Sequence, residues 1–178
     1  MRSVLLGLLV VLTTSRFGTA GEVENTSHWT LSRSMPVFSD SERFVLETTA
    51  LETAECRFGR KHAKLVFECH EGKASARFDT HCRISTDDLS DDGLVTYRVD
   101  RRDVLTRRFS ESDDKRALGL WTTTDSSAFI ETLKGGAQLA ARIKPQTYAP
   151  FIATFDLTGF DEAIQPLMDA CEPQSLSN

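Results

Sequence analysis

Alternating apolar and polar positions predict that most of this chain forms β-strands. The clearest case is the stretch 64–78, where apolar residues occupy every second position on both sides of a short loop. We expect a β-hairpin in which Cys69 faces Ala74. The same register pairs Leu65 with Phe78, so all these apolar side chains lie on one face of the sheet.

The same alternation predicts further strands at 28–34, 43–49, 94–100, 104–109, 117–121, 138–143 and 151–155. A short helix is expected after the capping residues Asp125 and Ser126. A second helix begins near Thr158, carries Cys171 on its apolar stripe, and contains Pro166, which should kink or break it. Together these elements predict a mainly β fold, either an antiparallel β-sandwich or a half-open barrel, with two short helices.

The first residues resemble a secretory signal. Arg2 precedes an apolar run at 4–12, and Gly18-Thr19-Ala20 forms a small-residue cleavage site. We therefore predict a signal peptide at 1–20 and a periplasmic or secreted protein with no transmembrane segment after cleavage. Residues 21–27 are expected to be disordered, 28–172 to form a single β-rich domain, and 173–178 to form a C-terminal tail.

The chain is acidic, with a formal net charge of -5. Loss of Arg2 and Arg16 with the signal would make the charge more negative. Nucleic acid is therefore not an expected partner, because binding to phosphates requires a basic surface.

Four cysteines in an exported chain, with no Cys-x-x-Cys pair, indicate two disulfides and not a metal site. In the predicted hairpin Cys82 lies far along the sheet from Cys69, beyond the reach of a disulfide. Cys56 enters the same strand from that distant end. The register therefore predicts Cys56–Cys82 and Cys69–Cys171, and the second bond links the C-terminal helix to the sheet.

Two histidines are weak metal candidates. Extension of the hairpin register makes His62 and His81 cross-strand neighbours on the solvent face, and two imidazoles can bind zinc or copper. A third ligand is not evident, so no metal and no cofactor are predicted. The acidic segment 85–93 lacks the ligand spacing of a calcium loop.

The outward face of Thr96, Arg98 and Asp100 is a possible contact surface, although Arg98 and Asp100 could equally form a structural pair. The segment 98–116 interleaves basic and acidic residues. It could bind an anionic envelope glycan or a partner protein, but ion pairs within the segment are favoured.

No nucleophile elbow, phosphate loop or zinc-protease motif occurs in the sequence. No catalytic residue is predicted, and a non-catalytic role is favoured while enzymatic activity stays open. Trp29 and Trp121 are expected to lie in the core and not to act as ligand platforms.

Four motifs carry a resemblance to a known family: Leu-Val-Phe-Glu-Cys at 65–69, Val-Thr-Tyr-Arg-Val-Asp at 95–100, Phe-Ser-Glu-Ser at 109–112 leading into Ala-Leu-Gly-Leu-Trp at 117–121, and the segment 155–171. Their order resembles the type VI secretion-associated family called VasI or TagO, which are exported accessory proteins of Gram-negative bacteria. The two recurrent cysteines of that family correspond to Cys69 and Cys171. No catalytic residues are established for the family.

The resemblance implies a non-catalytic periplasmic binding or scaffolding protein whose partner is an envelope or secretion-apparatus protein. Two alternatives are an envelope-acting hydrolase and a secreted inhibitor-like factor.

Overall fold

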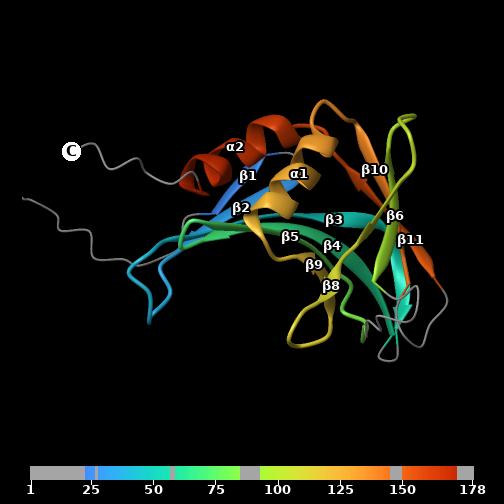
Figure 1. Cartoon of the computed structure of the whole chain (residues 1–178), viewed down its shortest axis with the longest axis horizontal. Coiled ribbons are helices and arrows are strands. Elements are labelled where there is room, and N and C mark those ends of the chain that lie inside the picture. Colours follow the sequence, from blue (N-terminus) through green and yellow to red (C-terminus); the bar gives the residue numbers. More distant parts are fainter. Residues whose placement is uncertain (1–22, 27, 57–58, 85–92, 145–149, 172–178) are drawn as a thin grey trace, which may run out of the picture.

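The computed structural model describes residues 23–26, 28–56, 59–84, 93–144 and 150–171. These described residues are mainly β, with two antiparallel sheets and two helices, as predicted (Figure 1). The predicted signal peptide and C-terminal tail lie outside the described residues. Within those residues, neither helix has the length or apolar character needed to cross a membrane.

The larger sheet has seven strands in the order β1-β2-β3-β4-β5-β9-β8. They are β1 (Val23–Thr26), β2 (Trp29–Ser34), β3 (Arg43–Cys56), β4 (Gly59–His70), β5 (Lys73–Asp79), β9 (Ala117–Leu120) and β8 (Ser110–Glu111). The expectation of disorder at 21–27 is wrong for residues 23–26, which pair with β2. The backbone edge of β2 offers free hydrogen-bonding groups, and pairing with it does not require an apolar pattern.

The smaller sheet has four strands in the order β11-β10-β6-β7. They are β6 (Leu94–Val99), β7 (Leu105–Arg108), β10 (Gln138–Ile143) and β11 (Phe151–Asp156). The sheets meet where β11 lies against the long strand β3. The register of β3 shifts between Thr49 and Thr53. In this irregular stretch the Glu52 carboxylate accepts a hydrogen bond from the Thr154 N–H at 2.7 Å.

The central hairpin has the predicted register. Cys69 pairs with Ala74 and Leu65 pairs with Phe78. The loop is tight, because its central residues Glu71 and Gly72 have φ angles of 52° and 68°. Two successive positive φ values are typical of the type I′ turn, whose twist matches that of the flanking strands.

Helix α1 (Thr123–Leu133) begins earlier than predicted. The capping residue is Thr122, whose side chain accepts a hydrogen bond from the Asp125 N–H, and not Asp125 or Ser126. The Ser126 hydroxyl is buried and donates to the Ala74 carbonyl at 2.9 Å, which attaches α1 to β5.

Helix α2 (Phe160–Cys171) runs through Pro166 without ending there, so the expected break is absent. Proline removes one backbone hydrogen bond. Buried residues before and after Pro166 hold the helix against the sheet. They include Phe160, Ile164 and Leu167. Figure 1 shows α1 and α2 on the same face of the seven-stranded sheet.

An aromatic core fills the space between the helices and the sheets. Its largest members, all nearly inaccessible to solvent, are Trp29, Phe67, Phe78, Phe109, Phe129, Phe155 and Phe160. Phe129 of α1 is central, because its ring packs edge-on against Tyr97 of β6 and Phe78 of β5. The core therefore joins α1 to both sheets.

The structure contains both predicted disulfides. Cys69 of β4 is bonded to Cys171 at the end of α2. Cys56 at the end of β3 is bonded to Cys82, which follows β5. The first bond fixes the C-terminal helix to the hairpin, and the second fixes the chain after β5 to the far end of β3.

Replacement of both Cys69 and Cys171 by alanine should lower the free energy of unfolding by about 5 kcal/mol. This bond joins residues 102 positions apart and so strongly restricts the unfolded chain. The matched control replaces Cys56 and Cys82, which are 26 positions apart. That control should lose about 3.5 kcal/mol. Urea denaturation without reductant measures both losses, and a larger loss from the second pair would contradict the expectation.

Candidate functional site

The face of the seven-stranded sheet that points away from the helices is polar. Leu65 and Phe67 of β4 point into the core, whereas Lys64, Glu68 and His70 lie on the other face, together with one buried apolar residue, Val66. We call this the outer face. It continues across β5 and β9, and both helices lie on the opposite side of the sheet (Figure 1).

An open cleft of about 570 Å³ lies on the outer face. Its lining comes from β3, β4, β5, β8, β9, the connection between β8 and β9, and the residue after β9. The lining residues are Arg43, Glu68, Arg77, Asp79, Glu111, Ser112, Asp113, Asp114, Ala117 and Trp121. We call this the outer-face cleft.

A carboxylate held by two guanidinium groups forms part of the cleft floor. Glu68 accepts hydrogen bonds from Arg43 Nε at 2.7 Å and Nη2 at 2.9 Å, and from Arg77 Nη1 at 2.8 Å. Only 17% of the Glu68 side chain is exposed. Burial raises the pKa of this carboxyl, but the hydrogen bonds from the two arginines outweigh burial and leave the pKa below its ordinary value. Glu68 is therefore ionised at neutral pH.

Trp121 forms a platform at the edge of the cleft and is 41% exposed. Its indole lies flat over Gly119, where a Cβ would stand 2.6 Å from Trp121 Cε2. The indole Nε1–H donates to the Ser110 carbonyl at 3.3 Å. The expectation that Trp121 belongs to the core is wrong, whereas Trp29 is buried as predicted. A sequence signal for this exposed position was available: a glycine stands two positions before the tryptophan, on the same face of the strand, and leaves room for the indole.

The acidic connection between β8 and β9 forms one wall of the cleft. The Ser112 hydroxyl donates to Asp114 Oδ1 at 2.6 Å and accepts from the Ala117 N–H at 3.0 Å. The hydrogen bond from Ser112 lowers the pKa of Asp114, so this carboxyl is ionised at neutral pH. Glu111 and Asp113 border the same space.

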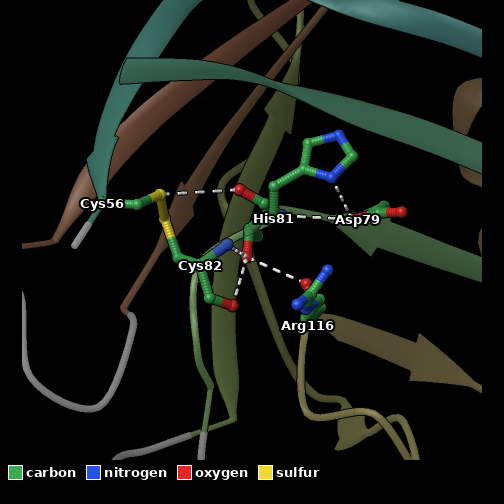
Figure 2. The surroundings of a disulfide bond; sticks show 6 residues. Cys56, Asp79, His81, Cys82 and Arg116 are labelled. Atoms are coloured by element: carbon green, nitrogen blue, oxygen red, sulfur yellow. Dashed lines mark hydrogen bonds and ion pairs between the residues drawn. A yellow bond between two sulfur atoms is a disulfide. The ribbon is translucent and has the colours of Figure 1, made fainter. Parts of the chain in front are cut away.

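The segment after β5 follows Asp79, a lining residue of the cleft, and there Cys82 forms its disulfide with Cys56 (Figure 2). Figure 2 shows His81 facing Asp79, which accepts from the His81 backbone N–H at 3.1 Å. The Thr80 N–H and hydroxyl both donate to the Arg116 carbonyl at 3.0 Å. These bonds join the acidic connection to the end of β5 and fix the shape of the cleft.

The structure does not bring the two metal candidates together as a cross-strand pair. The β4–β5 pairing ends at Lys64 and Asp79, so the register that would place His62 opposite His81 does not extend that far. His62 Nδ1 instead lies 2.8 Å from the Ala50 carbonyl oxygen. Within the described ranges, no three His, Cys, Asp or Glu side chains gather as metal ligands. The acidic segment considered for calcium lies outside the described residues, except for Gly93.

The three residues of the predicted contact surface have different surroundings in the structure. Asp100 is structural, because its carboxylate accepts from the Ala137 and Gln138 N–H groups at 2.9–3.2 Å. Thr96 lines a smaller hollow of about 330 Å³ on the four-stranded sheet. Arg98 is exposed on β6. As a joint contact surface, the three residues stay a prediction.

Several basic residues of the segment 98–116 bond to other groups of the fold. Arg102 donates to the Thr132 and Lys134 carbonyls at 2.9 Å, near the end of α1. Arg107 pairs with Asp125. Lys115 likewise lies near Glu111. These contacts favour the interpretation in which the segment's charges pair with nearby groups.

A loop with exposed apolar side chains precedes Arg43, one of the lining residues of the cleft. Between β2 and β3, Val37 is 91% and Phe38 is 101% exposed. The loop is held in place, because the Ser39 N–H donates to the Pro36 carbonyl at 3.0 Å and Ser39 Oγ lies 3.2 Å from His70 Nε2. We call it the apolar loop. In Figure 1 this loop and the β8–β9 connection both extend on the side of the sheet opposite the helices.

The chain matches no protein-family model and no curated protein. Among solved structures it is similar to the crystal structure of invasion associated protein B from Bartonella henselae, with 12% identity and a TM-score of 0.46. The similarity covers 85% of this chain and 99% of that one. A likeness this weak carries no information about function, and the resemblance to VasI and TagO stays a prediction.

The lowered pKa of Glu68 gives an expected pH dependence. A carboxyl whose folded pKa lies below its ordinary value of 4.5 stabilises the fold fully above that pH, and this contribution is lost as the pH falls through the folded value. Glu68→Gln should cost about 2 kcal/mol at pH 7. It should also flatten the loss of stability below pH 4.5, measured by urea denaturation across pH. If the free energy of unfolding of the variant falls as steeply below pH 4.5 as that of the unchanged protein, Glu68 is not the source of the pH dependence.

Proposed function

We propose that this protein is an exported, non-catalytic binding protein that docks a protein partner on the outer face of its larger sheet. The observation that carries the proposal is the apolar loop, where Val37 and Phe38 are almost completely exposed next to each other. Apolar side chains grouped at one exposed place are typical of interaction sites. The hydrogen bonds of Ser39 restrain the backbone of this loop before a partner arrives, which lowers the entropic cost of binding.

The outer-face cleft extends this surface. Arg43 begins β3 directly after the apolar loop and also lines the cleft. A partner that covers the loop can therefore reach the cleft without crossing a helix. An aromatic platform and a bordering set of charged groups are features that protein interfaces use for affinity and register.

Two disulfides support an oxidising compartment, such as the periplasm or the exterior. We propose an envelope or secretion-apparatus protein as the partner. The type VI secretion role rests on the resemblance to VasI and TagO.

A hydrolase is the second candidate, because one contact among the described residues joins a serine hydroxyl to an imidazole: Ser39 Oγ to His70 Nε2 at 3.2 Å. A serine nucleophile needs a third group that orients the histidine. Here Ser39 Oγ instead donates to Glu71 Oε1 at 3.5 Å, and Ser39 Oγ accepts from the Ser41 N–H at 3.1 Å. This pattern favours a structural role for Ser39 in the loop.

Partner docking can be tested by photo-crosslinking in cells of the native host. A photoreactive phenylalanine analogue is placed at Phe38, at Trp121, and at Glu162, an exposed control position on α2. We expect a protein adduct of the same mass from positions 38 and 121 and not from position 162. Absence of adducts at 38 and 121, or the same adducts from all three positions, would overturn the proposal.

Phe38→Ser should separate binding from folding. The side chain is fully exposed, so the free energy of unfolding should change by less than about 0.5 kcal/mol. The adduct formed from position 121 should nevertheless decrease several-fold, because the apolar contact is lost. Thr154→Ser, a comparably mild change at the junction of β3 and β11, should leave that adduct unchanged.

The hydrolase alternative predicts something different for Ser39→Ala. Loss of a nucleophile would abolish hydrolysis of activated esters by the purified protein. Under the binding proposal the purified protein shows no esterase activity above the rate in buffer, either with Ser39 or with alanine at that position. Activity that disappears in the variant would favour the hydrolase.

A further inference from the structure

We propose that the outer-face cleft binds a basic side chain, lysine or arginine, presented by an extended segment of the partner and stacked on Trp121. This inference rests on the proposed docking function and adds the chemistry of the group that the cleft accepts. Three properties of the cleft carry it: the presentation of the indole, the charge of the lining, and the internal pairing of its arginines.

The indole is presented with one ring face available. Gly119 lies directly beneath the other face, and the Nε1–H is held by the Ser110 carbonyl. An immobilised tryptophan face attracts a cation through its quadrupole, and tryptophan is the strongest aromatic residue for this interaction. The long apolar stems of lysine and arginine can also lie against the ring.

The lining is acidic. It contains five carboxylates, those of Glu68, Asp79, Glu111, Asp113 and Asp114, and two guanidinium groups, which gives a formal charge of -3. Carboxylates next to an aromatic face favour a cationic ligand and repel an anionic one.

The two arginines of the cleft do not reverse this preference. Arg43 and Arg77 both donate to the same carboxylate, Glu68, and that bonding occupies one side of each guanidinium. The remaining carboxylates stand along the rim. Asp113 is exposed there, and the structure describes no ion pair for it. Asp113 is therefore the residue to which we assign the charge contact with the incoming cation.

The opposite assignment, an anionic glycan on basic residues of the segment 98–116, has less support. Arg102 and Arg107 are bonded to groups at the two ends of α1. Lys115 lies 3.5 Å from Glu111. A neutral oligosaccharide could also stack on an indole and donate hydroxyl hydrogen bonds to the carboxylates, but it would gain no ionic attraction from them. The charge of the cleft distinguishes these ligands.

Nuclear magnetic resonance can test the inference, because the chain has two tryptophans and one is buried. The side-chain N–H signal of Trp121 reports the cleft, and that of Trp29 is an internal control. The probes are tetra-arginine amide, tetra-glutamate and the neutral sugar chitotetraose. We expect tetra-arginine amide to shift the Trp121 signal and leave the Trp29 signal in place, with weaker binding as NaCl rises from about 0.05 to about 0.5 M.

Three variants separate the ring from the charge. Trp121→Ala removes the platform and should weaken tetra-arginine binding about 10-fold by calorimetry. Gly119→Ala retains every charge but displaces the indole, because a Cβ would overlap it, and should weaken binding similarly. Asp113→Asn retains the ring and should weaken binding about 3-fold. The backbone amide spectrum of each variant shows whether it is folded.

Two results would overturn the inference. One is a Trp121 shift with tetra-glutamate or chitotetraose and none with tetra-arginine. The other is unchanged tetra-arginine affinity in both Trp121→Ala and Gly119→Ala, which would indicate general charge attraction. Either result leaves the docking proposal standing if positions 38 and 121 still crosslink to one partner. Loss of those adducts would overturn the docking proposal itself.

Discussion

The pairing register of β4 with β5 is the constraint on which the rest of this structure depends. It places Cys69 opposite Ala74 on the core face, where Cys69 can form its bond with Cys171 of α2. The same pairing turns Phe67 and Phe78 inward to the aromatic core. Because side chains alternate strictly along a strand, a slip of one residue would expose that core and separate the two cysteines.

The candidate site uses the other half of the same alternation. Glu68 and Arg77 lie between the core residues of the hairpin, so the strands that bury the aromatic rings also fix the cleft floor. Arg43 reaches Glu68 from the neighbouring strand. The site is therefore built largely on strands of a packed sheet, which gives the cleft a defined shape before any ligand arrives.

Sequence reasoning succeeded where local periodicity determined the answer and failed where distant segments meet. The hairpin and both disulfides followed from alternation and strand length. The proposed pair of His62 and His81 failed because the strand ends early: Thr80 turns away and bonds to the Arg116 carbonyl instead of continuing the β4–β5 ladder. Similarly, Pro166 did not end its helix, since packing on the sheet outweighs one missing hydrogen bond.

The sequence by itself determined the mainly β fold, the central register and the disulfide partners, because these depend on side-chain period and on the reach of a covalent bond. Only the tertiary structure decided which polar residues gather into a cleft. Trp121 became a platform because Gly119 leaves room beneath it. The acidic connection became a cleft wall because backbone hydrogen bonds fasten it to the end of β5. The contact of Gly119 with Trp121 is local, but the strands and the connection that form the cleft come from segments far apart in the chain, whose proximity no local pattern encodes.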